Sequence, residues 1–213
     1  MIGPVSNRTY PIWSDVLFRN LQAKFDGKTE LPIEIEEICQ ALVEMGYQDD
    51  IRVVSEEMDT SQLLGTYVQF TEPSGGLYSE PQMVSLIVYP SNIDDPTLQR
   101  MICAKELVHV CDAHVSQTSE PNDIMELARV LSGKASLGDE PRMTMKVAAD
   151  MLAQQKGLML LFPKAARVIA RQKLTEEQTT LEDLADKLQL PVATVEDMID
   201  ESWDQIADAL TQI

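Results

Sequence analysis

Residues 104–109 read Ala-Lys-Glu-Leu-Val-His, and their types and spacing come close to a metal-binding pattern. In the motif His-Glu-x-x-His, two histidines four residues apart share one helix face and hold Zn²⁺, while the glutamate polarises a zinc-bound water. Here Lys105 stands at the first histidine position, whereas Glu106 and His109 keep theirs. A protonated ammonium has no lone pair for a metal, so the chemistry of this segment turns on Lys105.

We expect a helix from about residue 96 to residue 115 to carry this segment, because a proline at its start suits a first helical turn. A helical projection places Lys105, His109 and Asp112 on one face, with Glu106 at its edge. His114 points to the opposite side, so its predicted role is structural.

The three cysteines are an odd set: Cys39, Cys103 and Cys111. If the last two share a helix, their separation corresponds to about 12 Å of axial rise, which is too far for a disulfide. We expect buried thiols in a reducing compartment. A nucleophilic pair of Cys111 with His109 is disfavoured, because the two side chains would point roughly 160° apart on a helix.

Composition excludes several classes of function. The chain has 213 residues, 44% hydrophobic composition and a formal net charge of -18. This length can bury a sizeable core, whereas the acidic charge argues against nonspecific binding to nucleic acid or an anionic membrane. We find no apolar run long enough to span a bilayer and no apolar signal core, so the expected location is cytoplasmic.

The periodicity of apolar residues predicts an α+β fold that is mostly helical with a small antiparallel sheet. Gly46 is well placed to end one of the helices. The predicted helices cover about 14–25, 33–45, 96–115, 121–131 and 141–157, and the predicted strands cover 51–54, 66–70 and 84–89.

The C-terminal region has the element pattern of a helix-turn-helix, with helices expected at 181–190 and 192–199. A recognition helix delivers basic or amide side chains to DNA, but residues 192–213 contain no Lys or Arg. We therefore predict that these helices pack into the core and bind no DNA. A basic stripe of Lys164, Arg167 and Arg171 precedes them.

Four stretches together resemble the ImmA/IrrE-type metallopeptidases, which are zincin-like proteins. Residues 31–38 resemble the first helix of that family and residues 86–89 the strand before its site. Residues 100–109 resemble its Arg-x-x-x-Ala-His-Glu-x-x-His helix, and residues 150–163 its downstream Glu-x-x-Ala run, which ends in Leu-Leu-x-Pro. The resemblance implies a zincin-like domain at 1–163 with an N-terminal helix, and a helical region at 164–213 packed on it.

The resemblance also implies a site. In this family the downstream acid supplies the third metal ligand, and Asp150 is the matching position, one methylene shorter than the usual glutamate. Family members cleave helix-turn-helix repressors of mobile elements and stress responses. Because Lys105 replaces a ligand, we expect a degenerate site of Lys105, His109 and Asp150, with no cofactor, in which the lysine ammonium substitutes for the metal cation.

Our leading hypothesis is a catalytically degenerate zincin-like protein that binds or regulates a protein partner, such as a basic helix-turn-helix repressor. The partner would pair with the strand near residues 84–89. The alternative is an active metallopeptidase that holds zinc through His109, Asp150 and Asp112, with Glu106 as general base. Two further readings stay open: a Lys105 that simply points to solvent, and a structural or toxin-antitoxin interaction module.

Overall fold

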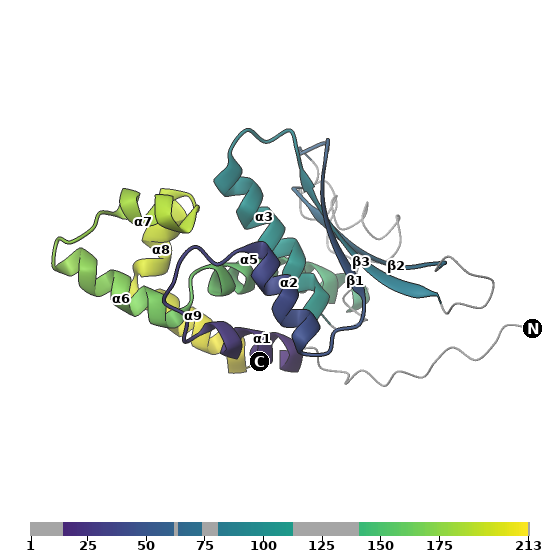
Figure 1. Ribbon diagram of the computed structural model, residues 1–213, viewed down its shortest axis with the longest axis horizontal. Helices are drawn as coiled ribbons and strands as arrows, with labels where there is room; N and C mark the ends of the chain where they lie inside the picture. The colour runs from purple at the N-terminus through teal and green to yellow at the C-terminus, as the bar shows by residue number, and fades with distance from the viewer. Residues whose placement is uncertain (1–14, 62–63, 74–80, 113–140, 213) are drawn as a thin grey trace, which may run out of the picture.

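The computed structural model describes residues 15–61, 64–73, 81–112 and 141–212. Within these residues the fold is α+β and mostly helical, as the sequence predicts (Figure 1). The elements in chain order are α1 (Asp15–Phe25), α2 (Ile35–Glu44), β1 (Asp50–Glu56), β2 (Thr66–Glu72), β3 (Gln82–Pro90), α3 (Pro96–Val108), the 3-10 turn η1 (His109–Cys111), α5 (Pro141–Leu161), α6 (Lys164–Thr175), α7 (Leu181–Leu188), α8 (Val192–Ile199) and α9 (Glu201–Gln212).

The sheet has the strand order β1-β3-β2 and is mixed, so the antiparallel prediction is wrong for one of its two pairings. β2 pairs antiparallel with β3, whereas β1 pairs parallel with it, with Ile51 opposite Ser85. The periodicity of a strand reports which faces are buried but says nothing about the direction of its neighbour. β3 is central, so both of its edges are hydrogen-bonded, and the predicted docking of a peptide along residues 84–89 is wrong.

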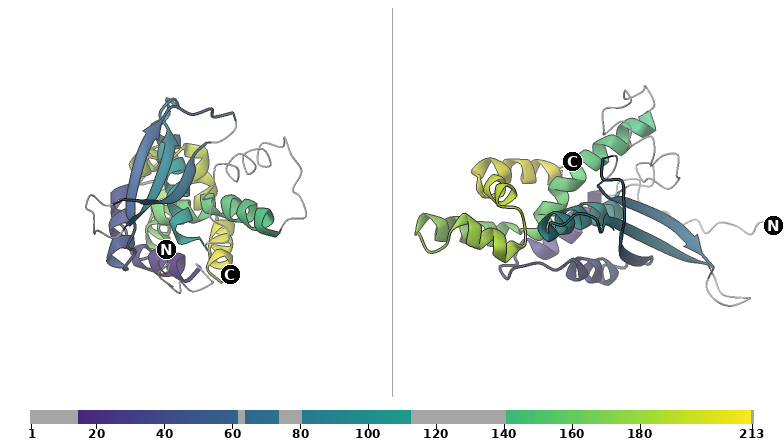
Figure 2. Two further views of the ribbon diagram at one scale, coloured as in Figure 1. Left: turned by 90° about the vertical axis from the view of Figure 1, so that its right-hand side faces the viewer. Right: turned by 90° about the horizontal axis from the view of Figure 1, so that it is seen from above.

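α3 connects the sheet to the helical part of the fold, because it packs against β3 on one side and against α5 on another. In Figure 1 it lies between the sheet and the other helices, and Figure 2 shows the sheet extending away from the helical part. Ile87 of β3 and Leu107 of α3 are both buried in the main core, at 0% and 1% exposure. The sheet therefore packs directly against α3, the helix that carries Lys105 and Glu106.

The start of α3 follows from its sequence. The carboxylate of Asp95 accepts hydrogen bonds from the backbone N–H groups of Thr97 and Leu98, and Pro96 occupies the first turn. The helix ends at Val108, earlier than predicted, and continues as the short 3-10 turn η1 before Asp112 becomes extended. The chain therefore leaves the helical conformation at Asp112, whereas His109 keeps it.

α2 also follows its sequence signals. Glu34 and Glu37 form a reciprocal capping box at its start, and Gly46 adopts a φ of 91° just beyond its end. A left-handed conformation of this kind favours glycine, which explains why the helix stops where the sequence predicts.

The C-terminal helices belong to the same hydrophobic core as the rest. Leu184, Leu188 and Val195 are buried in it, as the sequence predicts, together with Trp203. The basic stripe on α6 faces the acids of α9: Arg167 and Arg171 both contact Asp204, at 3.1 Å and 2.5 Å, and Lys164 contacts Asp208 at 3.2 Å. The stripe therefore joins two helices of the fold.

His114 and the helix predicted at 121–131 lie outside the described residues. Within the described ranges, no helix combines the length and apolar character needed to cross a membrane.

Candidate functional site

The structure brings together all five residues that the sequence marks as candidates. Lys105 and Glu106 come from α3, His109 from η1, Asp112 from the residue that follows η1, and Asp150 from α5. Their side chains are mostly buried, with exposures between 3% and 17%. They form a compact charged cluster at the junction of α3 and α5.

Lys105 points into this cluster. Its Nζ donates hydrogen bonds to Asp150 Oδ1 at 2.6 Å and to Glu106 Oε1 at 3.0 Å. The side chain is 17% exposed, which does not fit the reading in which it simply points to solvent. The lysine ammonium therefore lies between the carboxylates of Glu106 and Asp150.

His109 is held from both sides. Its Nδ1 lies 2.5 Å from Asp112 Oδ2, whereas its Nε2 lies 3.6 Å from Asp150 Oδ1 and 3.9 Å from Glu106 Oε2. The ring of Tyr67 stacks beside it, with the two ring centroids 6.4 Å apart. Asp112 and Asp150 therefore face opposite nitrogens of the imidazole.

The pKa values of the cluster reflect a competition between burial and charge. Burial alone lowers the pKa of Lys105 and of His109, but the surrounding carboxylates outweigh it: the pKa of Lys105 is raised, and hydrogen bonds with Asp112 and Asp150 raise that of His109 to about 10. Burial alone would raise the pKa of Asp150, but His109 and Lys105 hold it below its usual value. Both bases therefore carry their protons at neutral pH.

The formal charges nearly balance. Lys105 and His109 supply two positive charges against three carboxylates, Glu106, Asp112 and Asp150, which leaves a net charge of -1. Two organic cations thus provide the charge of +2 that Zn²⁺ would bring to such a pocket. A buried group of this kind needs each partner, because removing one leaves the others uncompensated.

Close packing of α3 on α5 makes the contact between Lys105 and Asp150 possible. A Cβ added to Gly157 would lie 3.0 Å from backbone atoms of Ala104 and Lys105. Asp150, Ala153 and Gly157 recur at helical spacing on α5, so the carboxylate lies on the face that approaches α3. Gly157 was not among the residues predicted to shape the site, although a glycine inside a helical pattern is a signal for close helix approach.

Gly65 closes the cluster from the other side. A Cβ at this position would lie 2.8 Å from Glu106 Cγ and 2.9 Å from Glu106 Oε1. Gly65 directly precedes β2, and only a residue without a side chain lets that strand begin so close to the glutamate. The start of β2 therefore lies directly beside the cluster.

Tyr67 links the cluster to a second buried polar group, which the sequence pattern does not predict. Its hydroxyl lies 3.3 Å from Ser85 Oγ, which in turn donates to Asp49 Oδ2 at 3.2 Å. The hydroxyl of Tyr47 and the amide of Gln69 donate to the same carboxylate oxygen, at 3.0 Å and 2.5 Å. Burial raises the pKa of Tyr67 to about 12, so its ring stays neutral beside His109.

The candidate donor side chains are not arranged around one metal position. Within the described ranges, no group of three or more His, Cys, Asp or Glu side chains is arranged to hold a metal. Asp150 already accepts from the ammonium of Lys105, and Asp112 occupies the Nδ1 side of His109, away from Asp150. The ligand set of His109, Asp150 and Asp112 would need these three side chains to rearrange around one point.

Comparisons of the chain with protein families, with curated proteins and with solved structures found no match.

Proposed function

We propose that the chain is a catalytically degenerate zincin-like protein that binds or regulates a protein partner. The single observation that carries this proposal is the ammonium of Lys105, which is held between Glu106 and Asp150. The resemblance to the ImmA/IrrE-type metallopeptidases supplies the class, and the ion cluster supplies the reason why a domain of this class would keep its fold without metal.

Glu106 and Asp150 are both paired with Lys105, which argues against a working peptidase. A general base must reach a proton on the attacking water, but Glu106 is 3% exposed and accepts from Lys105. A third ligand must be free to approach the ion, but Asp150 lies against the same ammonium. Both roles are blocked by one side chain, so binding is the function that the geometry favours.

The chemistry of the partner follows from charge. At a formal net charge of -18, the chain attracts cationic surfaces and repels nucleic acid. A basic helix-turn-helix repressor fits this requirement. We place both the chain and such a repressor in the cytoplasm. Within the part of the chain that the structure describes, the outer edge of β2 has no strand partner, and β2 begins beside Glu106. We propose this edge, in place of β3, for any strand-like docking of the partner.

Restoring the metal site tests the degenerate reading. We expect the double variant Lys105→His, Asp150→Glu to bind about one zinc per chain, because it regains two histidines four residues apart and a longer third ligand. The natural chain is expected to hold none. Elemental analysis of protein purified without an affinity tag measures both.

The matched control is Lys105→Gln, Asp150→Glu, which removes the ammonium without adding an imidazole. Zinc binding by this control would show that the ammonium alone kept the metal out. About one zinc on the natural chain would refute the degenerate site and support the metallopeptidase.

Partner binding has its own test. We expect a basic helix-turn-helix repressor to bind the full chain in the presence of a chelator, to stay uncleaved, and to bind more weakly above 0.1 M salt, where the Debye length falls below about 10 Å. Titration calorimetry measures the affinity. A salt-independent affinity, or sequence-selective binding of duplex DNA by the chain itself, would contradict the charge argument.

A further inference from the structure

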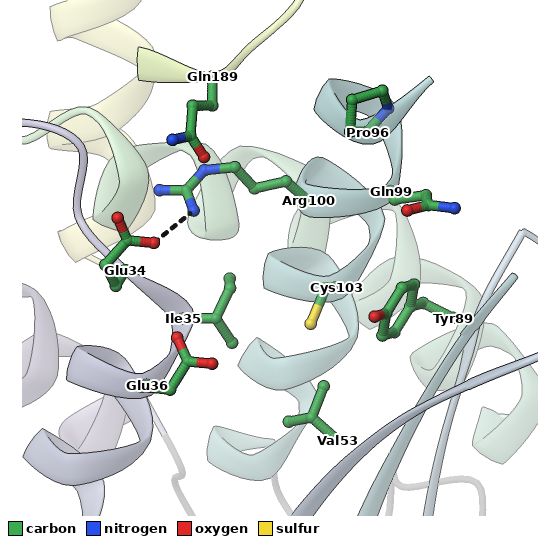
Figure 3. A pocket seen from close by; sticks show the side chains of 10 residues that line it. All are labelled: Glu34, Ile35, Glu36, Val53, Tyr89, Pro96, Gln99, Arg100, Cys103 and Gln189. Atoms are coloured by element: carbon green, nitrogen blue, oxygen red, sulfur yellow. Dashed lines mark hydrogen bonds and ion pairs between the residues drawn. The ribbon is translucent and has the colours of Figure 1, made fainter. Parts of the chain in front are cut away.

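A second site lies on the other side of α3, away from the cluster of Lys105. It is a pocket of about 250 Å³ between the start of α2, the first half of α3, the sheet and the turn from α7 to α8 (Figure 3). Arg100 and Cys103 of α3 line it, and a helical projection turns both away from Lys105. The volume is below the range of drug-sized ligands, so it suits a single side chain with its adjoining amide.

Arg100 is the unusual group in this pocket. Its side chain is 8% exposed, and its Nη atoms donate to the carbonyl of Ile33 and, at 3.3 Å, to Glu34 Oε2. Its Nε is buried and has no hydrogen-bond partner among the described residues. A buried donor without an acceptor is unfavourable, and an entering carbonyl oxygen would supply that acceptor.

The other residues that line the pocket include apolar and acidic side chains, which favour a ligand group other than a carbonyl. Figure 3 shows the guanidinium of Arg100 beside Glu34 and Gln189, with Ile35, Glu36 and Cys103 around the same space. Ile35, Val53 and Cys103 give an apolar floor, whereas Glu34 and Glu36 are exposed acids at the rim. An aliphatic stem that ends in a cation would cover the floor and reach the acids.

We propose that this pocket binds a lysine residue of a protein partner. The carbonyl of the lysine accepts from Arg100 Nε, its methylene stem lies on Ile35 and Val53, and its ammonium pairs with Glu36. The proposal rests on the proposed function only in taking the ligand from a basic protein. It does not depend on the cluster around Lys105.

The probe is Nα-acetyl-lysine N-methylamide, which carries one carbonyl on each side and one ammonium. Titrated into the full chain labelled with ¹⁵N, it should give saturable shifts confined to the amides that surround the pocket. Glu36→Gln should weaken binding by about fivefold or less, as expected for a partly exposed ion pair. Arg100→Lys keeps the charge but removes the Nε–H group, and should weaken binding by about fivefold.

Two controls separate this site from general attraction. Glu182→Gln removes an exposed acid of α7 outside the pocket and should leave the affinity unchanged. The norleucine analogue of the probe lacks the ammonium and should bind the natural chain more weakly than the lysine probe does. The two probes should bind Glu36→Gln with equal affinity. Because Glu36 is exposed, this variant is expected to fold even if Arg100→Lys does not.

The outcomes distinguish the pocket from the function. Equal effects of Glu36→Gln and Glu182→Gln, or no saturable shift, would overturn the lysine pocket even if a basic repressor binds the chain elsewhere. If the probe and variants behave as expected but no basic repressor binds, the pocket stands and the proposed partner is wrong.

Discussion

Replacing Lys105 by methionine is expected to destabilise the fold by about 3 to 5 kcal/mol, the typical loss when one partner of a buried ion pair is removed. The substitution keeps most of the stem but leaves Asp150 and Glu106 with His109 as the only nearby cation of the cluster. Denaturant midpoints at pH 7 give the free energy of unfolding.

The chain offers a matched control in Lys24→Met. Lys24 contacts Glu44 at 2.8 Å, but both side chains are well exposed, at 40% and 55%. Losing such a pair typically changes stability by only about 0 to 1 kcal/mol. Adding Asp150→Asn to Lys105→Met should recover part of the loss, because it removes an uncompensated charge. If Lys105→Met is no more harmful than Lys24→Met, the lysine does not stabilise the cluster.

Raising the pH from 6.5 to 10 is the second large perturbation, and we expect it to destabilise the protein. The pKa of His109 rises from 6.5 to about 10 on folding, because its hydrogen bonds with Asp112 and Asp150 outweigh its burial. A folded-state pKa above the unfolded one stabilises fully below pH 6.5, and this contribution is lost as pH rises through 10. The free energy of unfolding should fall by at most about 1.4 kcal/mol per pH unit, the limit for one proton.

His109→Gln supplies the reference for this experiment, because glutamine does not titrate. Urea unfolding gives the free energy of unfolding of both proteins between pH 6.5 and 10. The natural chain should lose stability more steeply with pH than the variant, and the difference between the two slopes is the contribution of His109. At acid pH the protein should lose stability as the pH falls, because contacts with His109 and Lys105 hold the pKa of Asp150 below its usual value of 3.8. Stability from Asp150 is present above 3.8 and is lost as pH falls through its folded-state pKa. Parallel curves for the two proteins would show that His109 is not held as a cation.

The local features of the fold were predictable because they depend on residues close together in the chain. The start of α3 at Asp95 and Pro96 and the end of α2 before Gly46 both follow from capping rules. The placement of Lys105 and His109 on one face follows from helical spacing, which persists through the last turns of α3. The prediction of buried thiols is confirmed for Cys103 and Cys111, whereas Cys39 is only partly buried.

The family resemblance supplied one contact that spacing could not. Asp150 was a candidate only because its position matches that of the downstream acid in the ImmA/IrrE-type metallopeptidases. Its hydrogen bond with Lys105 joins residues far apart in sequence, and helical periodicity assigns faces within one helix but not between two.

By itself, the sequence determined the fold class, most of the described helices, and the spacing that places a lysine four residues before His109. Only the tertiary structure decided where that lysine points, because the approach of α5 to α3 depends on Gly157 fitting against the backbone of Ala104. It also decided the mixed strand order and the pocket around Arg100. These features arise from pairings between distant segments, and the directions of such pairings are set by packing of the whole core, which no local pattern encodes.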